Sequence, residues 1–319
     1  MEALIGVLDA TLLASTVRLV SPILLAALGG LLTERAGIFN VALEGMMLVG
    51  AFTAVVVSAG TGNPWLAVGA AALAALVVAL AFGIVVVVLK GDAIVAGLAL
   101  NLLALGGTTY LMRAVFGVQG GYDDPAIVGL PRIEVPLIAD VPVIGAVLSG
   151  HSILVWGAVL GVFAIQLLLF RHPLGLRIRA VGEDPVAAGS LGIRVRRVQL
   201  GTILASGALC GVAGAQLSLG VVTQFVEGMT AGRGFIALVA VMFGRANPLG
   251  VLAASAFFGF AYALGLRLQG VGIPPQFVGM LPYLATIFVL VAVQARIRAR
   301  RRARSALDEA PPGVEVAPA

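Results

Sequence analysis

The stretch RHPLGLRIRAVGEDPVAAGSLGIRVRRV, residues 171–198, is the longest hydrophilic and strongly cationic interruption in an otherwise apolar chain. It carries six arginines, at positions 171, 177, 179, 194, 196 and 197. Apolar runs flank it, residues 152–170 before it and residues 200–222 after it. Because positively charged loops resist translocation, a basic segment between two membrane spans is predicted to lie on the cytoplasmic side.

The composition of the chain indicates that lipid is its solvent. Of its 319 residues, 60% are hydrophobic and 11% are charged, and the mean hydropathy is +1.09. A soluble globule needs far more charge on its surface. The 42 glycines suit membrane helices whose backbones approach closely. We therefore expect an all-α polytopic membrane protein. Its arginines lie between or after apolar runs, so we expect no nucleic-acid partner.

A membrane-spanning helix needs roughly 20 apolar residues, and several runs approach that length. They are residues 11–32, 41–59, 65–89, 93–116, 152–170, 200–222, 249–266 and 277–293. A further apolar piece, 235–243, is about half a span long. The basic segment 171–198 and the basic stretch RIRARRRAR at 296–304 should both be cytoplasmic, so an even number of crossings must separate them. We therefore expect about eight spans plus one short or broken helix that also crosses.

The remaining segments complete the predicted organisation. Residues 117–150 contain prolines at 125, 131, 136 and 142 and have mixed charge, which favours an extracytoplasmic loop. Residues 1–305 are expected to form one transmembrane domain, and residues 306–319 a disordered cytoplasmic tail. The single cysteine, Cys210, lies in an apolar run and is expected to be a buried, inert thiol.

Three polar residues fall inside or beside the predicted spans. Asn40 and Glu44 are four residues apart and share a helix face. A carboxylate at membrane depth usually faces protein or a water-filled cavity, so both residues are candidates for a substrate path. The alternative is that Glu44 only hydrogen-bonds a neighbouring helix. Asn101 is a third candidate, although a lone Asn in a span is more often a hydrogen bond between helices.

The middle of the basic segment is predicted to be a short helix. Glu183 and Asp184 suit the positive end of a helix dipole, Pro185 suits its first turn, and Gly192 can end it. Such a helix, with a small and smooth face, could sit in a cleft on a soluble partner. An amphipathic helix that lies on anionic lipid is the alternative.

No set of catalytic residues is present in the sequence. There is no GxxxxGK[ST] phosphate loop, so the chain itself is not expected to hydrolyse ATP. The only histidines are His151 and His172, and neither an HExxH motif nor paired cysteine ligands occur. We therefore expect neither an enzyme nor a metal or cofactor site.

Three segments resemble a known family. GEDPVAAGSLGI (182–193), preceded by RHPLGLRIRAV, resembles the cytoplasmic coupling loop of ABC importer permeases of the branched-chain amino acid and simple-sugar class. ERAGIFNVALEGMMLVGAF (34–52) and GRGFIALVAVMFGRANPLG (232–250) resemble motifs of the subgroup that imports nucleosides of the guanosine type. The segment 182–193 departs from the family pattern, because Glu183-Asp184-Pro185 precedes Ala187-Ala188 where the family has an uninterrupted Glu-Ala-Ala.

The resemblance implies a fold and a set of partners. The fold would be that of a type II ABC importer, and the chain would be the permease subunit that moves nucleosides, related ribosides or simple sugars across the cytoplasmic membrane of a bacterium. Its partners would be an ABC ATPase subunit, a second and similar permease, and an extracytoplasmic substrate-binding lipoprotein. The residues that the resemblance assigns to ATPase coupling are Gly182, Glu183, Asp184, Pro185, Ala187, Ala188 and Gly192.

A second function remains open on the residues alone. A self-sufficient secondary transporter or channel could use Glu44 as a relay for protons or cations, because ionisable groups inside membranes often serve ion pathways.

Overall fold

The computed structural model describes residues 10–134 and 149–269. The chain divides into one compact unit that ends at Leu264 and a second that begins at Gly265. All contacts given below lie within the first unit. The predicted span at 277–293 and the predicted tail at 306–319 fall outside the described residues.

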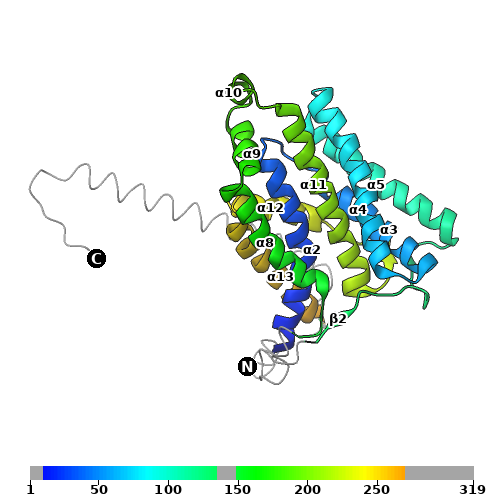
Figure 1. Cartoon of the computed structure of the whole chain (residues 1–319). Coiled ribbons are helices and arrows are strands. Elements are labelled where there is room, and N and C mark those ends of the chain that lie inside the picture. Colours follow the sequence, from blue (N-terminus) through cyan, green and yellow to red (C-terminus); the bar gives the residue numbers. More distant parts are fainter. Residues whose placement is uncertain (1–9, 135–148, 270–319) are drawn as a thin grey trace, which may run out of the picture. The chain divides into compact units, whose positions relative to one another are not determined.

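Seven helices in the described part of the chain are long and apolar enough to cross a membrane. Two of them, the spans that begin with α4 and α11 (Figure 1), end in a stretch of π-helix. The helices are α2 (Ala10–Arg35), α3 (Leu43–Thr61), α4 (Pro64–Gly83) with η1 (Ile84–Val88), α5 (Ala93–Phe116), α8 (Ile153–Arg171), α11 (Val195–Ala215) with η2 (Gln216–Val222), and α13 (Pro248–Gln269). Each lies at a run that the sequence predicts as a span.

The short apolar piece at 235–243 is also a helix. It forms α12 (Arg233–Phe243), whose 11 residues are too few to cross a bilayer at about 1.5 Å per residue. The prediction of one short helix among longer ones is therefore confirmed, whereas the prediction that the chain also crosses the membrane here, with residues outside α12, stays a prediction.

Side-chain caps fix where several helices begin. The carboxylate of Asp92 accepts hydrogen bonds from the N–H groups of Ile94 and Val95, both at 2.9 Å. Asn63 caps α4 in the same way, with Pro64 as the first helical residue. These groups satisfy N–H donors that have no partner inside the helix.

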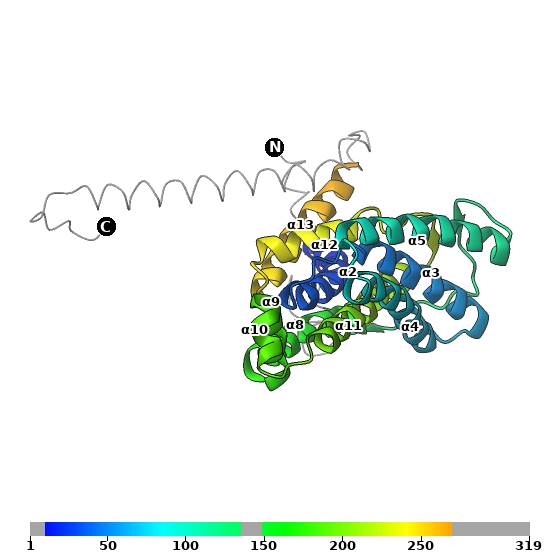
Figure 2. The same ribbon diagram turned by 90° about the horizontal axis from the view of Figure 1, so that it is seen from above.

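Helix α11 is packed on several sides, against α4, α2 and α3. Figures 1 and 2 both show α2 and α11 in the middle, with α8 on one side and α3, α4 and α5 on the other. Glycines permit this packing. A Cβ atom on Gly211 would lie 2.7 Å from the Cα of Ala72, and it would also meet the backbone carbonyl of Ala71. No side chain fits there, so the helix axes can approach only because glycine occupies the contact.

The outer helices expose the apolar side chains that a soluble protein would bury. Leu102 on α5 is 70% exposed and Leu73 on α4 is 66% exposed, whereas Leu28 and Leu31 on α2 are fully buried. Exposed aliphatic surface of this kind suits lipid or another membrane subunit.

Short elements join the spans. Strand β1 (Gly121–Tyr122) pairs antiparallel with β4 (Phe225–Val226), and β2 (Arg132–Ile133) pairs antiparallel with β3 (His151–Ser152). The basic segment 171–198, predicted as a loop with one short helix, contains two helices. They are α9 (Pro173–Glu183) and α10 (Pro185–Ser190).

The close contact of α11 predicts the effect of a single methyl group. Replacing Gly211 with Ala should destabilise the protein by about 1–3 kcal/mol, because the added Cβ overlaps the backbone of α4. Gly69→Ala on α4 is the matched control, since a Cβ there meets nothing within 4 Å. The measurement is the melting temperature of each purified variant in the same detergent. Equal melting temperatures for the two variants would show that the α4–α11 contact is looser than the structure indicates.

Candidate functional site

The residues between α2 and α3 form a short non-helical junction that carries Asn40. Asn40 is fully buried. Its Oδ1 accepts a hydrogen bond from the N–H of Ala42 at 3.0 Å, and its Nδ2 donates to the Oγ of Ser206 on α11 at 3.2 Å. Asn40 therefore fixes the shape of the junction and ties it to the central helix.

Asn101, on α5, holds the same junction from the opposite side. Its Oδ1 accepts a hydrogen bond from the N–H of Gly45 at 2.8 Å, and its Nδ2 donates to the carbonyl of Val41 at 3.0 Å. One amide side chain thus satisfies a donor and an acceptor of the backbone at the start of α3, where such groups have no partner within the helix. This is the hydrogen bond between helices that a lone Asn in a span predicts.

Glu44 joins the first turn of α3 to the start of α12. Its Oε1 accepts a hydrogen bond from the N–H of Gly232 at 2.8 Å, and its Oε2 accepts one from the N–H of Gly234 at 2.6 Å. A carboxylate at a helix N-terminus meets unpaired donors and the positive end of the helix dipole. Charged hydrogen bonds of this kind are about twice as strong as neutral ones.

The glycines around Arg233 are required by this contact. Gly232 has a φ of +82°, a backbone conformation that glycine adopts without steric cost. A Cβ on Gly234 would lie 2.5 Å from the backbone N and Cα of Glu44. The sequence Gly-Arg-Gly therefore lets the backbone of α12 reach the carboxylate.

The three candidate path residues meet around one junction, and two of them line a cavity of about 520 Å³. The cavity lies between α3, α5 and the segment that leads into α12, and we call it the junction cavity. Aliphatic side chains form most of its wall, with a few polar groups. Its lining residues are Glu44, Gly45, Leu48, Leu98, Asn101, Leu102, Leu105, Gly228, Thr230, Ala231 and Phe235. Asn40 is not among them and acts on the cavity through the junction.

Two buried polar residues near the site find partners far away in sequence. Gln216 accepts a hydrogen bond from Ser152 at 2.7 Å and donates one to Ser21 at 3.0 Å. It does not line the junction cavity. Arg233 was missed by the sequence reasoning. Its guanidinium donates to the hydroxyl of Tyr262 at 2.6 Å and lies over that ring, 4.4 Å from the centroid.

The predicted coupling residues lie at the α9–α10 corner. Asp184 accepts hydrogen bonds from the N–H groups of Val186 and Ala187, at 2.9 and 3.0 Å, and Pro185 is the first residue of α10. Gly192 follows the helix with a φ of +82°. The helix therefore begins and ends where the sequence predicts. Gly182 and Glu183, by contrast, belong to the end of α9.

The surface of α10 is apolar although it is exposed. Val186 is 80% exposed and Leu191, just after the helix, is 82% exposed, while Ala188 is buried. In Figure 1, α10 lies at the end of the bundle where α11 begins. An exposed apolar tip on a short capped helix suits insertion into a cleft on another protein.

The α9–α10 corner contacts the same junction that carries Asn40. A Cβ on Gly182 would meet the carbonyl oxygen of Arg35 and would lie 3.1 Å from the N atom of Gly37. Arg35 in turn donates a hydrogen bond from Nε to the carbonyl of Ala246, in the turn after α12, at 2.6 Å. The corner is therefore in backbone contact with the junction, and the side chain of Arg35 links the end of α2 to the turn after α12.

The chain is similar to known proteins over most of its length. The family profile described as branched-chain amino acid transport system / permease component matches residues 12–290. The guanosine ABC transporter permease protein NupQ of Bacillus subtilis is 34% identical over 289 residues, 86% of this chain and 89% of that protein. The nucleoside ABC transporter permease protein NupC of Lactococcus lactis is 36% identical over 281 residues, 85% of this chain and 88% of that protein.

A third relative is named for a different substrate. TsgC13 of Haloferax volcanii, a proposed glucose ABC transporter permease protein, is 35% identical over 309 residues, 89% of this chain and 90% of that protein. No solved structure matches the chain.

The contact between Glu44 and α12 predicts a loss of stability on neutralisation. Glu44→Gln should lower the stability by about 2 kcal/mol or more, because the amide loses the charge and one of its two acceptors facing the N–H groups of Gly232 and Gly234. Glu183→Gln is the control, since that carboxylate is exposed at the end of α9. The measurement is thermal unfolding of the purified variants. A Glu44→Gln melting temperature equal to that of the control would contradict the anchoring role.

Proposed function

This chain belongs to the family of permease components of branched-chain amino acid transport systems, and from that premise we propose that it imports nucleosides, related ribosides or simple sugars. Its relatives are permease proteins of ABC transporters, and the chain is a multi-pass membrane permease subunit of an ABC importer, not an enzyme. The expectations of family and of broad function drawn from the three sequence motifs are thus confirmed.

The topology that we propose has about eight spans, type II-like, and a further crossing at the segment that contains the short helix α12. Seven span-length helices lie in the described residues, and the run at 277–293 would supply another. The basic segment 171–198 would be cytoplasmic and residues 117–150 extracytoplasmic, because arginines favour the inner side. The membrane would be the cytoplasmic membrane of a bacterium.

The junction cavity is the observation that carries the substrate proposal. Its volume of about 520 Å³ falls within the range of small-molecule sites, about 300–1,000 Å³. Such sites combine apolar walls with a few fixed polar groups, and the cavity has that character, with Glu44, Asn101 and Thr230 among aliphatic side chains. A sugar or a nucleoside presents hydroxyl groups and, in the nucleoside, an apolar base face. Two of the relatives are named for nucleosides, which favours that substrate class.

ATP hydrolysis in a partner subunit would drive import through contact with α10. We place an ABC ATPase subunit against the exposed tip formed by Val186 and Leu191, with Asp184, Pro185, Ala187 and Ala188 shaping the helix. Movement of this tip would reach the junction through Gly182, which lies against Arg35 and Gly37. A second, similar permease would cover part of the exposed apolar surface of the bundle, and a substrate-binding lipoprotein would deliver substrate from outside.

The geometry of Glu44 weighs against a self-sufficient ion relay. Both of its oxygens accept hydrogen bonds from peptide N–H groups of α12, and peptide groups do not exchange protons on the time scale of transport. Its role in this proposal is to anchor α12 at the edge of the cavity.

Obstruction of the junction cavity tests the substrate path. Leu98→Trp adds bulk to the wall of the cavity, whereas Val95→Trp adds the same side chain at an exposed position on α5 outside it. Uptake of labelled guanosine by cells that contain the complete transporter should fall at least tenfold in Leu98→Trp and stay near wild type in Val95→Trp. Competition by unlabelled glucose in the same assay decides between the two substrate classes. Full uptake by Leu98→Trp would exclude the cavity from the path.

A charge on the tip of α10 tests the coupling proposal. Val186→Arg should abolish ATP-driven uptake while the protein still inserts and folds, because its side chain is 80% exposed and the change affects only a docking partner. Leu176→Arg on α9 is the control, an exposed apolar residue away from the tip. The measurements are uptake and stimulation of ATPase activity in the reconstituted complex. Normal coupling in Val186→Arg would move the docking surface elsewhere.

A further inference from the structure

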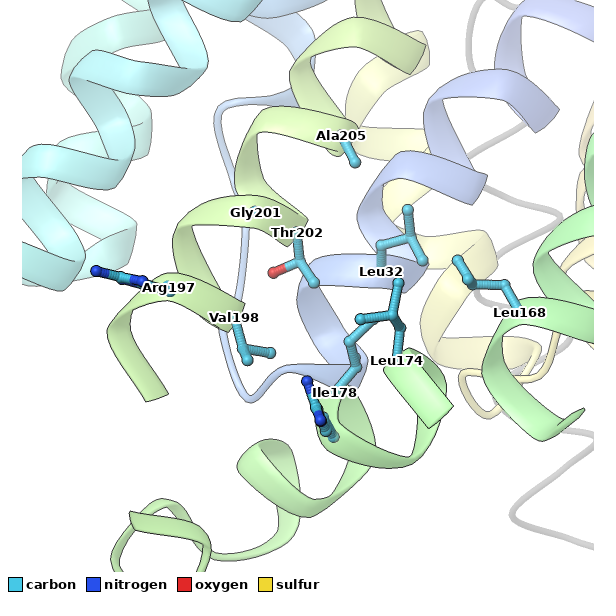
Figure 3. Close-up of a pocket in the computed structure, with 10 residues that line it drawn as sticks. Leu32, Leu168, Leu174, Ile178, Arg197, Val198, Gly201, Thr202 and Ala205 are labelled. Atoms are coloured by element: carbon cyan, nitrogen blue, oxygen red, sulfur yellow. The ribbon is translucent and has the colours of Figure 1, made fainter. Parts of the chain in front are cut away.

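A second cavity, of about 340 Å³, opens where α2 and α8 end and α11 begins, with α9 across it (Figure 3). Its wall is mostly aliphatic, and its polar lining residues are Arg177, Arg197 and Thr202. The aliphatic residues that line it are Leu32, Leu168, Leu174, Ile178, Val198 and Ala205. The side chains of Leu32, Leu168 and Leu174 converge on the same space in Figure 3.

The positions of these residues place the cavity at the boundary between membrane and water. Leu32 lies three residues before the end of α2, and Leu168 lies three residues before the end of α8. Val198 lies three residues after the start of α11. At 1.5 Å per residue, each is about 4.5 Å from its helix end. The cavity therefore opens about one turn inside the bundle, on the side of the basic segment.

A cationic space adjoins the apolar one. A neighbouring cavity of about 530 Å³ shares Arg177, Arg197 and Val198 with it and adds Arg194, together with Leu191, Gly192 and Ile193 after α10. Within the described residues, no carboxylate pairs with any of these three guanidinium groups. In Figure 3 the side chain of Arg197 extends away from the leucine cluster, so the charge lies outside the apolar space. An occupant that fits both spaces must have an aliphatic part and an anionic part.

We propose that this paired cavity binds an anionic phospholipid of the cytoplasmic leaflet. One acyl chain occupies the apolar cavity, and the phosphate lies among Arg177, Arg194 and Arg197. Arginine binds phosphate through paired N–H donors, and basic pockets at the ends of membrane helices attract anionic head groups. A free anion would leave the apolar cavity unfilled. The leaflet rests on the topology proposed above, whereas the pairing of charge with apolar space does not.

Lipid binding by the full-length permease alone tests the proposal without transport. Native mass spectrometry of protein purified in a neutral detergent can follow titration with phosphatidylglycerol and with phosphatidylcholine of the same chains. We expect at least one phosphatidylglycerol to bind at least tenfold more tightly than phosphatidylcholine, because the arginines attract an anionic head group and the head group of phosphatidylcholine carries no net charge. Equal affinities, or full displacement of phosphatidylglycerol by inorganic phosphate, would overturn the proposal.

Paired variants assign the binding to this site. Arg177→Gln/Arg197→Gln should abolish the preference for phosphatidylglycerol. Arg171→Gln/Arg196→Gln removes the same charge from exposed residues that line neither cavity, and it should retain the preference. Retention of the preference by the first pair would overturn the assignment.

A filled cavity tests the acyl-chain half of the proposal. Gly201→Leu places a side chain at the wall of the apolar cavity, where a Cβ meets nothing within 4 Å, so the fold tolerates it. It should weaken binding of phosphatidylglycerol at least fivefold. Gly157→Leu on α8, which also meets open space and lies outside the cavity, should not. Equal binding by both variants would exclude the apolar cavity as the chain site. A transporter that keeps lipid selectivity but carries no nucleoside would contradict the proposed substrate alone.

Discussion

The arrangement around the junction depends on one carboxylate and the helix end that it meets. Glu44 accepts hydrogen bonds from Gly232 and Gly234, which are 188 and 190 residues away in sequence. A helix of 11 residues has N–H donors in its first turn that find no partner within the helix. The carboxylate satisfies two of them, and in return the helix end stabilises its charge. The carboxylate and the helix end therefore stabilise each other. A movement of α3 relative to α12 would break this contact.

Close packing by small residues supplies the second constraint. α11 lies against the backbones of α4 and α3, and a Cβ on Gly211 or Gly50 would overlap the opposing chain. A membrane gives helices no hydrophobic reason to associate, so dispersion contacts at short range must hold them together. The glycines of α11 also favour a polar contact between helix and junction. They bring Ser206 within hydrogen-bond distance of Asn40, which fixes the junction in place.

How much of this structure the sequence predicts depends on how far apart in the sequence the interacting residues lie. The spans and the short helix follow from apolar length, because lipid permits few alternatives to a helix. The caps at Asp92 and Pro185 follow from local chemistry. The partner of Glu44 cannot be read this way, since nothing near residue 44 indicates Gly232. The sequence analysis predicts one helix in the basic segment and does not predict α9. The buried side chains of Ile178 and Val181 give α9 the period of an amphipathic helix, but the arginines between and before them make the segment resemble a charged loop.

The junction also explains how force applied at one end of the bundle could reach the cavity. Gly182 lies against Arg35 and Gly37 with no side chain between them, and Arg35 holds the turn after α12 by a hydrogen bond of 2.6 Å to Ala246. Contacts between backbones transmit displacement better than flexible side chains, because packed cores shift between discrete arrangements. A movement of the α9–α10 corner would therefore act at once on the junction before α3 and on the turn after α12. Those two segments adjoin the two helices that Glu44 holds together, so the opening of the cavity and the state of that carboxylate contact should be a single event.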